Sequence, residues 1–165
     1  MITGAESTGK SVLAESLAKH FSVPFISEIA RVYVEKLNRK YNYNDVETIA
    51  KKQVNLLNQL SKSNHSYLFV DTWLIITKIW FEVVFKKVPE WIENEILNTD
   101  IDLFLVCDTD LPWVPDLVRE NGGKSREILQ KKYIQQIEYY NFKYKIISGQ
   151  DENRFENAIN SLKIE

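Results

Sequence analysis

Cysteine, histidine and excess charge of either sign are all scarce in this chain. A single cysteine among 165 residues excludes an internal disulfide, and with two histidines it is too few to supply the four ligands of a structural zinc site. Lys and Arg number 21 and Asp and Glu 23, so the net charge of -2 gives no electrostatic basis for tight binding to nucleic acid. These absences favour a reducing, cytoplasmic setting and a partner other than nucleic acid.

Long hydrophobic runs and flexible linkers are also missing. The most apolar stretch, residues 68–85, contains Asp71, Lys78 and Glu82, and each would cost about 2.5–3.5 kcal/mol at a bilayer centre. We therefore expect no membrane insertion, and the N-terminus lacks the basic and apolar regions of a signal peptide. With 44% hydrophobic residues and no Pro/Gly/Ser-rich divider, the chain is predicted to form one domain over residues 1–165.

Short apolar runs alternate with longer segments of helical periodicity, which predicts an α/β fold. Tyr67–Val70 is a continuous apolar run ending at Asp71, as is typical of a buried parallel strand. The first strand is unusually short, so Met1 is expected to be a shifted or truncated start. The predicted strands cover residues 1–3, 24–27, 67–70, 103–107 and 144–148; the predicted helices cover about 10–21, 28–37, 44–60, 73–85, 125–142 and 151–162.

Helix starts and aromatic positions give further expectations. Asn44, followed by Glu47, is predicted to cap the third helix, and Ser125 the helix before the last strand. Trp80 is expected in the core, and Trp91 in a connector after Pro89.

Residues 4–11 carry the strongest chemical signal. Their sequence, Gly-Ala-Glu-Ser-Thr-Gly-Lys-Ser, matches the phosphate-binding loop (P-loop) pattern in full and lies between a predicted strand and a predicted helix. In such a loop the backbone N–H groups point at the phosphates, Lys10 reaches the β and γ phosphates, and the Ser11 hydroxyl ligates Mg²⁺. ATP is therefore expected to bind at Gly4, Glu6, Ser7, Thr8, Gly9, Lys10, Ser11 and Val12.

Two carboxylates follow predicted strands, where open α/β sheets bind ligands. Asp71 is expected to hold Mg²⁺, directly or through water; the alternative is a solvated residue that caps the next helix. Glu28 is placed to accept a proton from a substrate hydroxyl, or to act only as a first-turn acidic residue of a helix. Arg31 lies one helical turn later and forms either part of the site or a surface pair with Glu28.

Residues 108–126 are rich in helix and strand breakers and are predicted to form a mobile lid. Arg119 and Arg126 would bring guanidinium groups to the transferred phosphoryl group, unless they are ordinary solvated arginines. Trp113 lies in the same loop, where a flat substrate ring would stack on it.

Five segments in this order resemble the ribosylnicotinamide kinase domain of bacterial NadR-type proteins. They are residues 4–11, Ser27–Tyr33, Ile49–Gln53, Phe69–Thr72, and Pro112–Asp116 with Arg119. The resemblance implies a P-loop kinase fold of three α/β/α layers, with a mostly five-stranded parallel sheet. It also implies transfer of the ATP γ-phosphate to the 5′-hydroxyl of nicotinamide riboside.

The resemblance also implies roles for individual residues. Lys10, Glu28, Asp71, Arg119 and Arg126 would be catalytic, with either Glu28 or Asp71 as the base, and Ser11 and Asp71 would hold Mg²⁺. Substrate contacts would come from Glu28, Arg31, Gln53, Asp71 and Trp113, and Trp73 would either stack on substrate or belong to the core. A separate adenylyltransferase would complete NAD synthesis.

Two other functions agree with the same residues. One is a kinase for another nucleoside or hydroxylated metabolite, because the phosphate machinery does not specify the acceptor. The other is an ATP-binding regulatory module without phosphoryl transfer, which would need Asp71 for Mg²⁺ but has no use for Glu28 as a base.

Overall fold

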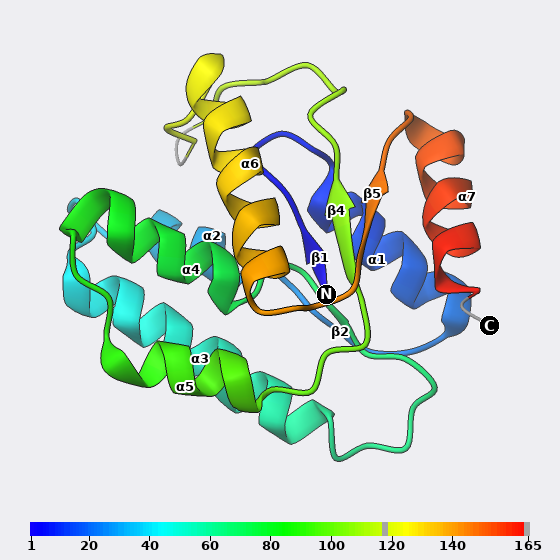
Figure 1. Ribbon diagram of the computed structural model, residues 1–165, viewed down its shortest axis with the longest axis horizontal. Coiled ribbons are helices and arrows are strands. Elements are labelled where there is room, and N and C mark those ends of the chain that lie inside the picture. The colour runs from blue at the N-terminus through cyan, green and yellow to red at the C-terminus, as the bar shows by residue number, and fades with distance from the viewer. Residues whose placement is uncertain (117–118, 164–165) are drawn as a thin grey trace.

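A parallel sheet with helices on both faces forms the fold (Figure 1), as described by a computed structural model over residues 1–116 and 119–163. Residues 117–118, inside the predicted lid range, and 164–165 lie outside this description. The elements in chain order are β1 (Ile2–Thr3), α1 (Lys10–Phe21), β2 (Phe25–Ile26), α2 (Ile29–Glu35), α3 (Tyr43–Leu60), β3 (Phe69–Val70), α4 (Leu74–Trp80), the π-helix η1 (Phe81–Phe85), α5 (Glu90–Asn98), β4 (Phe104–Cys107), α6 (Lys124–Tyr139), β5 (Tyr144–Ile147) and α7 (Asp151–Leu162).

The sheet order is β2-β3-β1-β4-β5 among the described residues. β1 pairs with β4, β4 with β5, and β2 with β3, all in parallel. An isolated parallel bridge between Ile2 and Asp71 joins the two groups, supported by a 2.9 Å hydrogen bond from Thr72 N to the Ile2 carbonyl. Parallel pairing sends all five carboxyl ends to one edge, which carries the P-loop and the predicted carboxylates.

Alternate residues along β4 face two hydrophobic clusters, so the sheet separates two helical layers. Leu105 and Cys107 pack with the cluster that includes α1 and α7, whereas Phe104 and Val106 pack with the larger cluster of α3 to α6. Figure 1 shows α1 and α7 together on one face, with α2 to α6 on the other. The predicted three-layer α/β/α architecture with five parallel strands is therefore confirmed.

Several helix boundaries differ from the predictions. Asn42, not Asn44, caps α3: its side chain accepts from Asp45 N, and the Asp45 carboxylate accepts from Asn42 N. The helix predicted over 73–85 changes to π geometry after Trp80.

Two further predictions about helices are wrong. Gly123, with a positive φ of 55°, precedes α6 instead of a capping Ser125, and α6 ends at Tyr139. Trp91 lies within helix α5, at a position where the sequence predicts a connector. Its indole N–H donates to the Glu47 carboxylate on α3 at 2.9 Å, so this tryptophan joins two helices of one layer.

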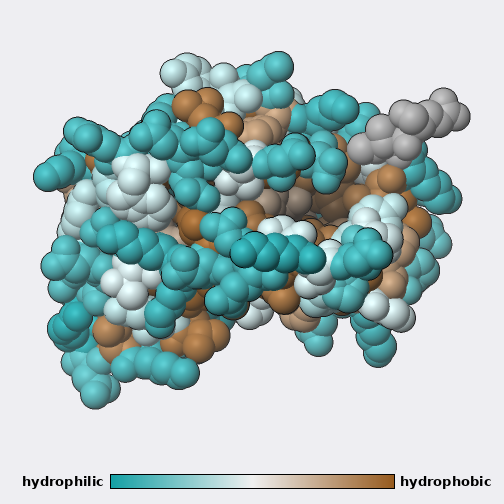
Figure 2. Space-filling view, turned by 90° about the horizontal axis from the view of Figure 1, so that it is seen from below, coloured by the Kyte–Doolittle hydropathy of each residue, from teal (hydrophilic) through white to brown (hydrophobic). Residues whose placement is uncertain are grey.

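The face at the amino ends of the strands is mostly hydrophilic (Figure 2). Hydrophobic side chains show there mainly in recesses between polar residues. No helix in the described residues is long and apolar enough to cross a membrane.

Candidate active site

The P-loop owes its shape to two glycines and a buried threonine. Gly4 has φ +137°, and a Cβ on it would lie 2.6 Å from the Cys107 carbonyl oxygen, so any side chain here would displace the backbone. Gly9, at φ +75°, turns the chain into α1. The buried Thr8 hydroxyl donates to the Ala5 carbonyl at 2.8 Å, which ties the loop to itself. The predicted turn and cradle are therefore present.

Lys10 and Ser11 occupy the first turn of α1, directly after this cradle. The Lys10 ammonium group donates to the Ala5 carbonyl oxygen at 3.0 Å, so its Nζ lies over the loop. Ser11 and Val12 are exposed beside it. This arrangement suits a nucleoside triphosphate. The backbone donors of the glycine-framed loop, the helix N-terminus and the lysine cation all complement phosphate oxygens.

Asp71 is 1% exposed at the end of β3, yet its carboxylate is only half satisfied. Oδ1 accepts from the Thr72 hydroxyl at 3.3 Å, whereas Oδ2 is buried with no hydrogen-bond partner among the described residues. A buried, unpaired carboxylate oxygen is costly unless a ligand completes it. No cluster of three acidic, His or Cys ligands occurs in the described chain.

Glu28 precedes α2 at the carboxyl end of β2. Burial raises the pKa of its carboxyl above the ordinary value, nearby Lys10 lowers it, and the negative charge of Asp71 raises it again. The Arg31 Nε lies 3.8 Å from Glu28 Oε2, and Arg31 also bonds Asp116 at 3.1 Å. An elevated pKa makes this carboxylate a better proton acceptor than a free glutamate.

A cavity of ≈ 180 Å³ opens between the P-loop, α2 and α4. Lys10 and Glu28 line it together with Arg31, so the phosphate-binding cation and the raised-pKa carboxylate face one space. The lining also contains three aromatic residues, Tyr41, Trp80 and Tyr133, which we call the aromatic wall. Aliphatic residues of α2, α4, η1 and α6 and the polar residues Thr72, Glu120 and Asn121 line the cavity as well. The Tyr41 and Trp80 rings meet edge to face with centroids 4.8 Å apart.

The lid range folds back onto the P-loop. The Trp113 indole N–H donates to the Glu6 carboxylate at 3.3 Å. A Cβ on Gly122 would lie 3.2 Å from the Trp113 ring, so the ring packs against the lid backbone. Trp113 is not among the residues lining the cavity, and its side chain in this structure joins the lid to the P-loop.

The two predicted catalytic arginines are both anchored in the lid region. Arg126 is 6% exposed and donates to the carbonyls of Leu111 and Ser7 at 2.8 and 3.0 Å; burial lowers its pKa. Arg119 bonds Asp116 at 3.1 Å and the Val114 carbonyl at 2.6 Å. Arg119 contributes to the potential at Glu28, where its charge lowers the pKa of that carboxyl.

Gln53 and Trp73, by contrast, are buried away from the cavity. The Gln53 amide accepts from the Thr77 hydroxyl at 3.1 Å and donates to the Thr72 carbonyl at 3.4 Å, so it supports two cavity-lining residues from behind. Trp73 is 1% exposed and belongs to the core.

A larger hollow of ≈ 480 Å³ lies at the amino ends of the strands. It is lined by Met1, Ile2, Leu162 and residues from within the segments 57–70 and 100–105. None of the predicted site residues lines it. Ligands of open α/β sheets bind at the carboxyl ends, so the smaller cavity beside the P-loop is the candidate active site.

The aromatic wall was not predicted from the sequence. Trp80 lines the cavity instead of lying wholly in the core, and Tyr41 and Tyr133 join it from a loop and from α6. No local sequence pattern identifies these three positions as cavity residues. The one signal is helical spacing: Trp80 lies four residues after Ile76, on the same face of α4, and both line the cavity.

Known proteins resemble this chain in sequence. The Escherichia coli K12 trifunctional NAD biosynthesis/regulator protein NadR is 25% identical over 160 residues, which is 93% of this chain and 39% of that protein. The chain thus spans about two fifths of that curated relative. These comparisons confirm the resemblance to NadR-type proteins.

Solved structures agree on the fold. A crystal structure of NadR protein in complex with NR matches with a TM-score of 0.79 and 22% identity, covering 98% of this chain and 49% of that one. The structure of deoxyadenosine kinase from M. mycoides with bound dATP matches with a TM-score of 0.66 and 16% identity. The match covers 99% of this chain and 97% of that one. Both likenesses confirm the predicted P-loop kinase fold.

A family model described as an AAA domain matches residues 1–154, nearly the whole chain. The chain therefore belongs to the AAA domain family.

Proposed function

We propose that this chain transfers the γ-phosphoryl group of Mg·ATP to the 5′-hydroxyl of nicotinamide riboside, forming nicotinamide mononucleotide. The observation that carries the proposal is that Lys10 of the P-loop and the Glu28 carboxylate line the same cavity. A regulatory module that only binds ATP has no need of a proton acceptor in a cavity beside the phosphates. The whole-length activities of the NadR relative belong to a protein much longer than this chain.

ATP would be held by the P-loop backbone, Lys10 and Ser11, and Mg²⁺ by Ser11 and Asp71. The metal supplies positive charge that offsets the phosphate oxygens during transfer. Lys10 adds a second positive charge at the same phosphates. Because Oδ2 of Asp71 lacks a hydrogen-bond partner among the described residues, that oxygen is available to the ion or its water.

Glu28 then acts as the base. As the substrate oxygen forms its bond to the γ-phosphorus, the bond from that phosphorus to the β–γ bridging oxygen breaks, and the hydroxyl proton passes to the Glu28 carboxylate. ADP leaves with the bridging oxygen. Asp71 is assigned to the metal instead, since its side chain is buried at the end of β3, whereas Glu28 lines the cavity.

The aromatic wall supports a substrate with a flat ring. Tyr41 and Trp80 present π surfaces, and the Tyr41 hydroxyl donates to the Glu120 carboxylate at 2.9 Å. Stacking on these rings, with Glu28 near the sugar, suits a riboside of an aromatic base. The solved NadR structure contains NR, and the name of the E. coli relative includes NAD biosynthesis; both favour nicotinamide riboside.

ADP release by the purified chain with Mg·ATP tests the proposal, with nicotinamide riboside compared against adenosine, deoxyadenosine and thymidine. We expect nicotinamide riboside to give the highest acceptor-dependent turnover, and Glu28→Gln to lose about 100-fold of it while retaining ATP binding. Preferential turnover of deoxyadenosine would instead favour a deoxynucleoside kinase, in line with the full-length match to that enzyme. ATP binding without any acceptor-dependent turnover would contradict a kinase function.

A further inference from the structure

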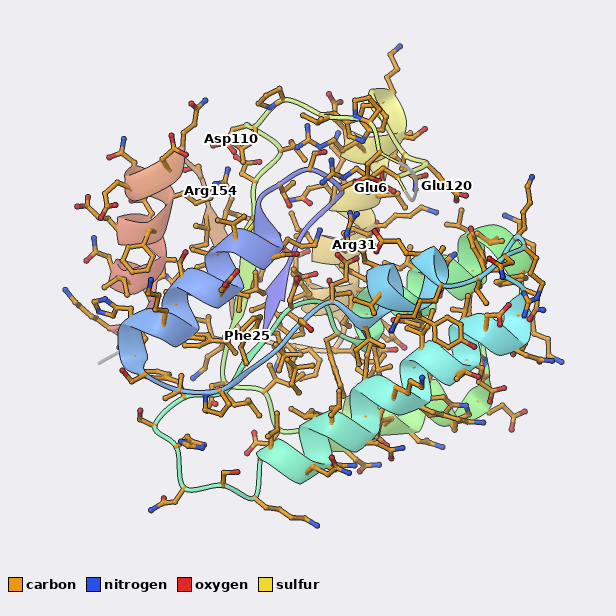
Figure 3. All side chains as sticks on the ribbon, turned by 180° about the vertical axis from the view of Figure 1, so that it is seen from behind. Glu6, Phe25, Arg31, Asp110, Glu120 and Arg154 are labelled. Carbon is orange, nitrogen blue, oxygen red and sulfur yellow. The ribbon has the colours of Figure 1, made fainter. Side chains whose placement is uncertain are left out.

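The Glu6 side chain, in the middle of the P-loop, bonds the lid region four times. Its carboxylate accepts from the Trp113 indole at 3.3 Å, from the backbone N–H groups of Glu120 and Asn121 at 3.2 and 3.0 Å, and from the Asn121 amide at 2.9 Å. Figure 3 shows Glu6 beside Glu120, with Arg31 approaching from α2. One carboxylate therefore gathers donors from two parts of a loop more than 100 residues away in sequence.

Ser7 adds a second attachment beside the first. Its hydroxyl oxygen accepts from Val114 N at 3.1 Å and lies 3.2 Å from the Val114 carbonyl oxygen, to which it donates. We define the docked segment as residues 113–116 and 119–121. Backbone N–H groups bind phosphate in a P-loop, so the Glu6 and Ser7 side chains are available to hold this segment.

The docked segment carries Arg119. Its guanidinium is fixed on the Val114 carbonyl and the Asp116 carboxylate, and Asp116 in turn bonds Arg31 next to Glu28. Glu120 and Asn121, which Glu6 holds, line the cavity itself. The attachment therefore places a cation near the base and closes one wall of the cavity.

We propose that Glu6 is a positioning residue that docks this segment on the P-loop and so keeps water out during phosphoryl transfer. The inference rests on the proposed kinase function. Where the segment is loose, a water oxygen attacks the γ-phosphorus, the bond to ADP breaks, and the water proton leaves with inorganic phosphate or solvent. Glu6 therefore sets the ratio of transfer to hydrolysis, not the affinity for ATP.

Limited trypsin digestion tests docking without any assay of activity. Trypsin cleaves the Arg119–Glu120 bond, whose own N–H donates to Glu6 in the docked segment. In Glu6→Gln, one acceptor oxygen becomes an NH₂ group that faces these donors, so cleavage at this bond should accelerate about fivefold or more. Cleavage after Lys62, in the exposed turn that follows α3, serves as the internal control and should keep its rate.

Kinetics supply the second readout. With nicotinamide riboside as acceptor, Glu6→Gln should lose about 10-fold in transfer turnover, while ADP release without acceptor should stay at the wild-type rate or rise, so that the ratio of hydrolysis to transfer increases about 10-fold or more. The Kd for ATP should stay within about twofold, because the backbone cradle, Lys10 and Ser11 are unchanged. Glu15→Gln, an exposed glutamate on α1, is the matched control and should behave as the wild type.

Each outcome decides the question. An unchanged cleavage rate after Arg119, or an unchanged ratio of hydrolysis to transfer, would overturn the docking role. A large loss of ATP affinity would show that the Glu6 side chain serves the nucleotide instead. If no nucleoside stimulates the wild type, the kinase proposal fails on its own, while faster cleavage at Arg119–Glu120 in Glu6→Gln would still establish docking.

Discussion

The pH dependence of phosphoryl transfer offers a direct test of Glu28 as the base. A base must be deprotonated to act, so activity is lost as the pH falls through its pKa. Burial and Asp71 raise the pKa of Glu28, while Lys10 and Arg31 lower it. The acid limb of kcat/KM should therefore lie above the range of a free glutamate, and removing Arg31 should move it further upward.

The expected size of this movement follows from the geometry of the pair. Arg31 Nε lies 3.8 Å from Glu28 Oε2, but the two side chains are 33% and 26% exposed. At this separation the interaction is about 1 kcal/mol in water, and exposed pairs measure roughly 0.2–1 kcal/mol. At about 1.36 kcal/mol per pH unit, Arg31→Gln should move the acid limb upward by roughly 0.1–0.7 pH units. Loss of the Arg31 bond to Asp116 acts in the same direction, because it removes one of the two arginines that pair with the Asp116 carboxylate.

The assay is kcat/KM for the acceptor from pH 4.5 to 8 at saturating Mg·ATP. Arg31→Lys keeps the positive charge without the planar guanidinium, so its limb should stay close to that of the wild type even if its KM rises. If the acid limb of kcat/KM in Arg31→Gln lies at the same pH as in the wild type, or at a lower pH, Glu28 is not the titrating base. A uniform drop in rate at every pH would show that Arg31 serves only in binding.

Two other substitutions probe the P-loop. Lys10→Ala removes the cation beside the γ-phosphate and should lower kcat about 100-fold or more in the ADP-release assay; unaffected turnover would contradict the assignment of the site. Gln130 accepts from Ala5 N at 2.8 Å and donates to the Cys107 carbonyl at 2.9 Å, so Gln130→Leu leaves two buried groups unpaired. It should lower the free energy of unfolding by roughly 2–4 kcal/mol, measured by urea denaturation with Gln130→Glu for comparison.

The features that sequence predicted well are those encoded locally. The P-loop depends on two glycines at fixed spacing, and the structure contains both of the turns that they allow. Parallel strands were predictable from apolar runs such as Tyr67–Val70, although only Phe69 and Val70 form ladder pairs. The carboxylates at the strand ends followed from the topology of parallel sheets, which sends every carboxyl end to one edge.

The features that sequence missed depend on contacts between distant segments. Trp80 looked like a core residue because its helix is apolar, yet it faces a space that exists only where α4, α2 and the lid meet. Trp113 was expected to stack on substrate, whereas its indole is bonded to Glu6, 107 residues away. The start of α3 was predicted wrongly for a simpler reason. Asn42 and Asn44 both suit an N-cap, and the Asp45 carboxylate selects Asn42 by accepting from its backbone N–H.

In the P-loop the backbone binds phosphate, whereas the side chains of Glu6 and Ser7 bond the lid. This division between backbone and side chain explains how one loop serves both purposes. Phosphate recognition by backbone N–H groups leaves the side chains at these two positions unconstrained by ATP. A loop that binds phosphate is also the surface nearest to the reacting atoms, so any segment fastened to its side chains is placed at the site of transfer. Docking through Glu6 and Ser7 therefore couples the order of the lid to the P-loop itself, and Arg126, which bonds the Ser7 carbonyl, extends this coupling to α6.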